Sequence, residues 1–165
     1  MSELTTFYLE MLDREVLCVK AGPSNFAVTI LEEAAPDVNR QFYQKVGGDW
    51  QWTERLKWSD EQWHAYVNRK ALTTGVIAVD SQPAGYFEIE SQQGGDVEIV
   101  QLGLLPEYVA CGLGGALVTT AIESAWSLSG TRRVWLHTCT RDHQSALVNY
   151  KRRGFTVYKT VKGIE

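Results

Sequence analysis

The stretch from Val97 to Leu117 constrains the fold more than any other part of this 165-residue chain. It begins with a largely apolar segment, Val97 to Leu104, into which one carboxylate, Glu98, is inserted. Such a segment is typical of a buried strand. Pro106 ends it, and the glycine-rich loop Gly112 to Gly115 leads into residues with the spacing of one helical face. The sequence therefore predicts a strand, a glycine loop and a helix in succession.

Strict alternation divides the side chains of this strand between its two faces. One face carries Val97, Ile99, Gln101 and Gly103, and the other carries Glu98, Val100, Leu102 and Leu104. On this pattern the single carboxylate lies among apolar neighbours, which would raise its pKa toward neutrality.

A glycine loop at the start of a helix is suited to binding an anion. Glycines lack Cβ atoms, so backbone N–H groups can converge there, and the helix dipole adds positive potential. The Lys-Ser/Thr pair of the Walker pattern is missing, and Leu117 stands where the dinucleotide-binding fingerprint has its third glycine. A nucleoside triphosphatase and a Rossmann fold are therefore disfavoured, while a plain turn into an ordinary helix stays as the alternative to a phosphate site.

Composition limits the classes of protein to which the chain can belong. With 44% apolar and 22% charged residues it is typical of a globular protein, and 165 residues suit one domain over residues 1–165. The net charge of −4 argues against a nucleic-acid surface, and no apolar run approaches the roughly 20 residues that span a bilayer. Three widely spaced cysteines indicate reduced thiols, so we expect a cytoplasmic protein without a metal ion. We also expect a monomer or a homodimer.

The remaining elements predict an α/β fold with a mixed sheet. Strands are expected at Thr6–Met11, Gly75–Val79, Gly85–Glu90, Arg133–Thr138 and Phe155–Val161, besides the one that begins at Val97. Helices are expected from Ser24 through Ala34, from Val38 to Val46, from about Asp60 to Arg69, after the glycine loop, and from Ser145 to Arg153. Helices first, then an antiparallel meander, then alternating strands and helices indicate a central mixed sheet with helices on both faces.

Two motifs resemble those of a known family. Val109 to Gly114 resembles the acetyl-CoA motif Gln/Arg-x-x-Gly-x-Gly/Ala of the GCN5-related N-acetyltransferase (GNAT) superfamily, with Val109 in place of the first side chain. Ala146 to Phe155 resembles the signature Ala-x-x-x-Tyr-x-x-x-Gly-Phe. The resemblance covers nearly the whole chain and implies a GNAT-like acyl-CoA N-acyltransferase fold. The family usually ends with one further strand, for which only Lys162 to Glu165 remain here.

The resemblance implies acetyl-CoA as the co-substrate, with its pantetheine along the strand and its pyrophosphate at the glycine loop. His143 stands where the family commonly has Asn, and the backbone N–H of Leu102 is implied to polarise the thioester carbonyl. The implied CoA-binding residues are Leu102, Gly103, Leu104, Ala110, Cys111, Gly112, Leu113, Gly114, Gly115, Ala116, His143 and Tyr150.

The resemblance also implies a catalytic acid and a base. Tyr150 takes the place of the tyrosine that protonates the departing thiolate, and a phenol keeps its proton at neutral pH. An amine must be neutral to attack, so a proton acceptor is needed, and Glu98 matches a glutamate that serves as general base in the branch related to histone acetyltransferases. Glu88 and Glu90 on the neighbouring strand are further candidates for the general base. The alternative for Tyr150 is a tyrosine that only packs at a helix end. The alternative for Glu98 is a carboxylate that faces solvent or forms a salt bridge.

The acceptor side of the expected site is rich in tryptophan. Between Trp50 and Trp63 tryptophans alternate with carboxylates, and aromatic faces and carboxylates both attract cations. We expect Trp50, Trp52 and Glu88 to bind a small amine with an apolar body, unless the tryptophans only pack a helix connection. The predicted function is direct acetyl transfer to a small-molecule primary amine in a ternary complex. A non-catalytic CoA-binding or sensing module and an enzyme acting on a protein amine are the alternatives.

Metal binding is not indicated. His137 and Cys139 share one strand face and His143 follows nearby, but no further residue completes a recognisable ligand spacing.

Overall fold

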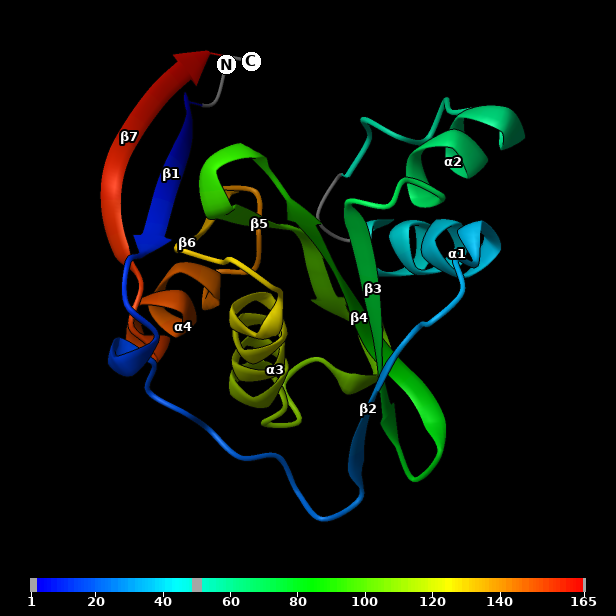
Figure 1. Cartoon of the computed structure of the whole chain (residues 1–165), viewed down its shortest axis with the longest axis horizontal. Coiled ribbons are helices and arrows are strands. Elements are labelled where there is room, and N and C mark those ends of the chain that lie inside the picture. The colour runs from blue at the N-terminus through cyan, green and yellow to red at the C-terminus, as the bar shows by residue number, and fades with distance from the viewer. Residues whose placement is uncertain (1–2, 49–51, 165) are drawn as a thin grey trace.

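One mixed sheet of seven strands forms the centre of the computed structural model, which describes residues 3–48 and 52–164 (Figure 1). The strands are β1 (Glu3–Met11), β2 (Phe26–Ile30), β3 (Leu72–Val79), β4 (Gln82–Ser91), β5 (Asp96–Leu104), β6 (Arg133–Cys139) and β7 (Thr156–Ile164). They lie in the order β2-β3-β4-β5-β6-β1-β7. All neighbouring pairs are antiparallel except β5 and β6, which are parallel.

Four helices in the described part of the chain cover the two faces of this sheet, as the order of elements predicted. They are α1 (Pro36–Gly47), α2 (Asp60–Val67), α3 (Gly114–Ser127) and α4 (Ala146–Arg153). On one face Phe87 of β4 packs with residues of α3 in the large apolar core. On the other face Tyr86 stacks on Phe42 of α1, with ring centres 4.9 Å apart. Because Tyr86 and Phe87 are consecutive in a strand, α1 and α3 lie on opposite faces.

The segment predicted as a helix from Ser24 is a strand. Phe26 to Ile30 forms β2, which pairs with β3 from Phe26 opposite Val79 to Ile30 opposite Gly75. The helical spacing of Phe26, Ile30 and Ala34 was coincidental. Val28, Thr29 and Ile30 are β-branched and therefore favour extended backbone, and the free edge of β3 offers them hydrogen-bond partners.

The first strand of the chain lies between two of the last. β1 pairs antiparallel with β6 from Thr6 opposite Cys139, and with β7 from Glu3 opposite Ile164. The sheet therefore obtains the strand between β6 and β7 from the N-terminal end of the chain, and not from residues beyond β7 (Figure 1).

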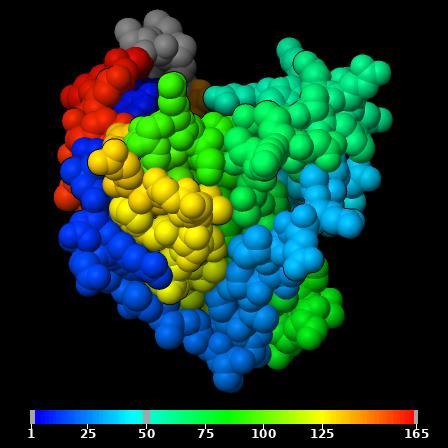
Figure 2. All heavy atoms as spheres, viewed as in Figure 1, coloured from blue at the N-terminus to red at the C-terminus, as the bar shows by residue number. Residues whose placement is uncertain are grey.

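After β1 the chain crosses the outer side of α3 and α4. Lys20 N donates to Thr119 Oγ1 of α3 (3.0 Å), and Cys18 N donates to the carbonyl oxygen of Arg153 (2.9 Å). Figure 2 shows this N-terminal segment in blue beside the yellow α3. The two contacts fix the crossing segment to both helices.

A bulge in β5 changes the alternation that the sequence suggested. Glu88 of β4 lies opposite Gln101, but Ile89 lies opposite Ile99, so Val100 has no partner position on β4. As a result Leu102 and Leu104 pack against the same core as Val97 and Ile99. The expectation that Leu102 and Leu104 share a face with Glu98 was wrong, because one extra residue reverses the side of every later side chain.

Two residues before the bulge, β5 separates from its other neighbour, β6. The parallel pairing with β6 consists of Asp96 with Arg133, Val97 with Val134 and Glu98 with Trp135. Past Glu98 the two strands are no longer paired, although β5 continues to Leu104 and β6 to Cys139. The sheet is therefore open between these two strands.

Candidate functional site

A cavity of about 650 Å³ lies where β5 and β6 separate. Its wall takes Leu117 and Val118 from α3 on one face of the sheet, and Tyr43 and Val46 from α1 on the other. The cavity therefore passes through the sheet. Residues 99–104 of β5, residues 136–139 of β6, Leu4, Thr6 and Tyr8 of β1, and residues of the α1–α2 and β6–α4 loops complete its wall.

The glycine loop forms one end of this cavity. Gly112 has φ +78° and Ala110 has φ +65°, so the loop turns through two left-handed residues before α3 begins at Gly114. Gly112 and Gly114 both line the cavity. The first N–H groups of a helix have no partner within it, so the start of α3 presents free donors toward the loop.

The two glycines that open α3 also permit close packing. A Cβ on Gly114 would lie 3.3 Å from Asn149 Nδ2 of α4, and a Cβ on Gly115 would lie 2.4 Å from Arg153 Nη1 and 2.7 Å from Lys20 Cδ. Lys20 and Arg153 thus bring positive charge next to the helix start. No local sequence pattern indicates Lys20, because its approach depends on the crossing of the N-terminal segment over α3.

The predicted CoA-binding residues divide into two groups. Those that line the cavity are Leu102, Gly103, Leu104, Ala110, Gly112, Gly114, His143 and Tyr150. Those that do not are Cys111, Leu113, Gly115 and Ala116. The side chains of Leu113 and Ala116 are buried in the protein, so these residues can meet a ligand only through their backbone.

Tyr150 lies on α4, on the α3 side of the opening. Its ring packs edge to face on Phe155 at 6.3 Å and also contacts the large core. Burial raises the pKa of Tyr150, and the negative charge of Asp142 raises it further. The phenol therefore holds its proton throughout the neutral range and lies in the cavity wall.

The loop between β6 and α4 is shaped by Asp142. Its carboxylate accepts hydrogen bonds from Thr138 Oγ1 and from Cys139 N, the latter at 3.1 Å. His143 Nδ1 accepts the N–H of Ser145 at 3.0 Å. These bonds fix the residues that precede Tyr150, and Asp142 had no role in the sequence prediction.

Glu98 is mostly buried, with a side chain 14% exposed. Gln92 Nε2 donates to its Oε1 at 3.0 Å, and His137 Nε2 lies 3.9 Å from its Oε2. Burial raises the pKa of Glu98, and the nearby His137 opposes this rise. Glu98 does not itself line the cavity, whereas His137 does.

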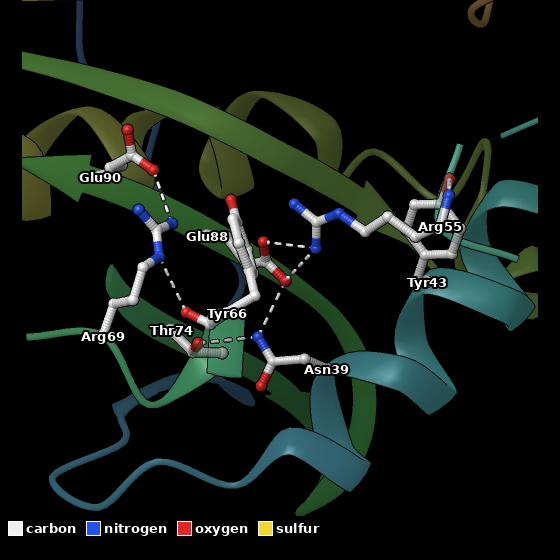
Figure 3. A network of polar contacts seen from close by, with 8 residues as sticks. All are labelled: Asn39, Tyr43, Arg55, Tyr66, Arg69, Thr74, Glu88 and Glu90. Atoms are coloured by element: carbon white, nitrogen blue, oxygen red, sulfur yellow. Dashed lines mark hydrogen bonds and ion pairs between the residues drawn. The ribbon is translucent and has the colours of Figure 1, made fainter. Parts of the chain in front are cut away.

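Glu88 lies elsewhere than expected. Its side chain is fully buried beneath α1 and is absent from the cavity wall. Asn39 Nδ2 donates to Glu88 Oε2 (2.9 Å), and Arg55 Nη1 donates to the same oxygen (3.1 Å) and lies 2.9 Å from Oε1 (Figure 3). A carboxylate enclosed in this way cannot contact an acceptor, so the expected role of Glu88 in substrate binding is replaced by a structural one.

The aromatic residues of the α1–α2 region surround the same arginine. The guanidinium carbon of Arg55 lies 4.3 Å from the ring centre of Tyr66, 4.9 Å from Trp58, 5.5 Å from Tyr43 and 5.6 Å from Trp63. The backbone N–H of Arg55 donates to Tyr43 Oη at 3.1 Å. The cation held by these aromatic rings and by a carboxylate is therefore a residue of the chain itself.

Of the expected acceptor residues, Trp52 borders the cavity. Trp52 also packs on Tyr43, with ring centres 5.5 Å apart. Trp50 lies outside the described residues. Thr53 and Glu54 line the cavity next to Trp52, so the described part of this loop exposes the carboxylate of Glu54 to the cavity.

Within residues 3–48 and 52–164, no group of three or more His, Cys, Asp or Glu side chains is placed to hold a metal ion. None of the helices in these two ranges is long and apolar enough to span a bilayer.

Comparisons with known proteins agree with this geometry. The model of the acetyltransferase (GNAT) family matches residues 31–155. No curated protein matches the sequence. Among solved structures, a GCN5-related N-acetyltransferase from Kribbella flavida is 18% identical with a TM-score of 0.70, and the match covers 96% of this chain and 56% of that one.

Two further structures are similar in fold. A GCN5-related N-acetyltransferase from Sphaerobacter thermophilus is 12% identical with a TM-score of 0.73, covering 95% of this chain and 49% of that one. An aminoglycoside acetyltransferase from an uncultured soil metagenomic sample is 15% identical with a TM-score of 0.62, covering 77% and 86%. The chain spans about half the length of the first structures that it matches.

The buried ion pair yields a stability prediction. Arg55→Met leaves the Glu88 carboxylate buried without a counter-charge, which should lower the free energy of unfolding by about 3–5 kcal/mol. Adding Glu88→Gln removes that charge and should restore most of the loss. Arg69→Met, which breaks the more exposed pair with Glu90, should cost less than about 1 kcal/mol. Urea unfolding measures all three, and equal losses in the single and double variants would contradict the assignment.

Proposed function

Because the chain belongs to the acetyltransferase (GNAT) family, we propose that it is an acetyl-CoA-dependent N-acetyltransferase, formed by one GNAT-like domain over residues 1–165. In this proposal a small-molecule primary amine attacks the thioester directly in a ternary complex. The observation that carries it is the cavity that passes through the sheet between β5 and β6. It connects the glycine loop on one face with Trp52, Thr53 and Glu54 on the other, so two substrates can enter from opposite sides.

The donor end of the cavity suits CoA. The first N–H groups of α3 and the neighbouring Lys20 and Arg153 favour a pyrophosphate. Beyond Glu98 the edge of β5 toward β6 has no strand partner, so its backbone groups are available to the amides of pantetheine. In this arrangement the N–H of Leu102 polarises the thioester carbonyl, a contribution of the oxyanion-hole type.

Two side chains assist the proton transfers in this proposal. Tyr150 donates its proton to the CoA thiolate as the carbon–sulfur bond breaks, which suits a buried phenol of raised pKa. Glu98 supplies the negative charge that draws a proton from the acceptor. Its raised pKa brings it nearer to neutrality, and its activity is lost as the pH falls through that raised value.

The acceptor end favours a cationic amine with an apolar body. Trp52 offers an aromatic face and Glu54 a carboxylate, and both belong to the loop that Arg55 holds against β4. One structure of similar fold is named as an aminoglycoside acetyltransferase, which supports a small-molecule amine as the acceptor. Cys18, Cys111 and Cys139 are free thiols, which fits a reducing cytoplasm, and the protein is proposed to act as a monomer or homodimer.

The direct test is an amine panel with acetyl-CoA, followed by release of free thiol and by mass spectrometry of the products. We expect amine-dependent thiol release with cationic amines of apolar body, and much less with amines that carry a carboxylate. Tight binding of acetyl-CoA without turnover of any amine would indicate a sensing module. Turnover of peptide amines alone would indicate an enzyme acting on proteins.

The charge of the glycine loop gives a second test. Gly112 has positive φ and an ideal Cβ there meets nothing within 4 Å, so Asn and Asp, which tolerate this conformation, are matched replacements. Gly112→Asp should weaken acetyl-CoA binding about tenfold or more relative to Gly112→Asn, because it adds negative charge next to the pyrophosphate. Calorimetry at low and high salt should show the difference shrinking with salt. Equal affinities of the two variants would place the phosphates elsewhere.

A third test addresses the proton donor. Tyr150→Phe should lower kcat by about 10²-fold while acetyl-CoA affinity stays nearly unchanged, because only the departing thiolate needs the hydroxyl. Tyr158→Phe, which alters an exposed phenol on β7, is the matched control and should behave like the wild type. A Tyr150→Phe enzyme with wild-type kcat would exclude the phenol as the acid.

A further inference from the structure

His137 lies where the two central strands separate. It follows Trp135, the last residue of β6 that pairs with β5, by two positions, so both side chains point to the α1 face of the sheet. Its ring centre is 6.4 Å from that of Trp135 and 5.6 Å from that of Tyr8, its partner on β1. The side chain is 51% exposed and lines the cavity. His137 is therefore held on the acceptor side of the opening.

Glu98 is fixed behind His137. Gln92 donates to one carboxylate oxygen of Glu98 at 3.0 Å, and Gln92 Oε1 in turn accepts the indole N–H of Trp135 at 2.9 Å. The other oxygen of Glu98 is left facing His137 Nε2 at 3.9 Å. Glu98 is not itself part of the cavity wall, so its carboxylate can affect a ligand in the cavity only by acting on the His137 imidazole.

We propose that His137 accepts the proton of the acceptor ammonium in the cavity, and that Glu98 is a positioning residue that orients the imidazole and balances its charge. This inference rests on the proposed N-acetyltransferase function and names the group that touches the acceptor. With its Nε2–H directed toward Glu98, a neutral imidazole presents Nδ1 as the base.

The proton balance of the reaction is complete in this arrangement. The ammonium loses one proton to His137, which passes it to water, and the neutral amine then attacks the thioester carbon. The carbon–nitrogen bond forms and the carbon–sulfur bond breaks. The second proton of the nitrogen leaves through water and replaces the one that Tyr150 gives to the CoA sulfur. One proton is released for each acetyl group transferred.

The acid and the base lie on opposite faces of the sheet. Tyr150 comes from α4, which packs beside α3, and His137 faces α1. An amine that approaches from the α1 face therefore meets His137, and a thiolate that leaves toward α4 meets Tyr150. This separation keeps the donated and the accepted proton apart during the reaction.

The charged groups around His137 lie on the neighbouring strands. Glu98 faces it from β5, and Glu90 of β4 is linked to Glu98 through Gln92 and paired with Arg69. From β1 it meets the ring of Tyr8, over whose centre Lys159 Nζ of β7 lies at 5.0 Å. The nearest charge is thus the carboxylate of Glu98, which stabilises the imidazolium. The rate of acetyl transfer should fall toward low pH as the Glu98 carboxylate, whose pKa is raised by burial, becomes protonated.

A double-mutant cycle tests the proposal. His137→Gln and Glu98→Gln should each lower kcat/KM by about 10²-fold at neutral pH and flatten the acidic limb of the pH–rate profile. Because Glu98 acts through His137, the double variant should be no slower than His137→Gln alone. Added imidazole should restore part of the rate of His137→Ala. His64→Gln, an exposed histidine on α2, is the matched control and should keep the wild-type rate and profile.

Any of three results would overturn the proposal. His137→Gln could keep the wild-type rate and pH profile, or the double variant could lose about 10⁴-fold because the two effects multiply. The third is a His137→Ala enzyme whose rate added imidazole does not restore. If the wild type acetylates no amine, the proposed function fails, and NMR still tests the pair. Glu98→Gln should then shift the NMR signals of the His137 ring at a fixed pH and leave those of His64 and His143 unchanged. The absence of such a shift would exclude the Glu98–His137 contact.

Discussion

The end of the pairing between β5 and β6 after Glu98 is the constraint on which the rest of the structure depends. Where neighbouring strands stay paired, their backbone N–H and C=O groups bond to one another. Where the strands separate, these groups need other partners. The extra residue at Val100 turns Leu102 and Leu104 toward the core, so the strand stays anchored while its edge is free. The cavity, the glycine loop at one end of it and His137 at the other all take their positions from this opening.

The Arg55–Glu88 pair shows why the role of Glu88 could not be predicted from the sequence. Four aromatic rings and a carboxylate are groups that recognise a cation, and the fold brings them together around Arg55. The chain places its own cation among them, which ties the α1–α2 loop to β4. The loop then exposes Trp52, Thr53 and Glu54 to the cavity, and this arrangement cannot be deduced without knowing where Arg55 lies.

Local patterns made part of the fold and site predictable. The strand, glycine loop and helix from Val97 onward, and Tyr150 on the helix before Gly154-Phe155, depend on residues near one another in sequence. The features that depend on pairing between distant segments were not predicted. The edge of β3 decides that Phe26–Ile30 is a strand, the register with β4 creates the bulge at Val100, and parallel pairing of β5 with β6 brings His137 to Glu98. No spacing within a single segment carries this information.

The position of β1 has a consequence for the order in which the protein folds. β6, which forms one wall of the cavity, is held between β5 and β1, and the backbone N–H of Thr5 reaches Thr140 Oγ1 across 135 positions of sequence. Closing so long a loop costs entropy before its contacts form, and such topologies fold slowly. During synthesis β1 emerges first and waits unpaired for the last two strands. The cavity is therefore among the last features to form, and a nascent chain has a long interval in which an apolar strand edge is open to aggregation or to chaperones.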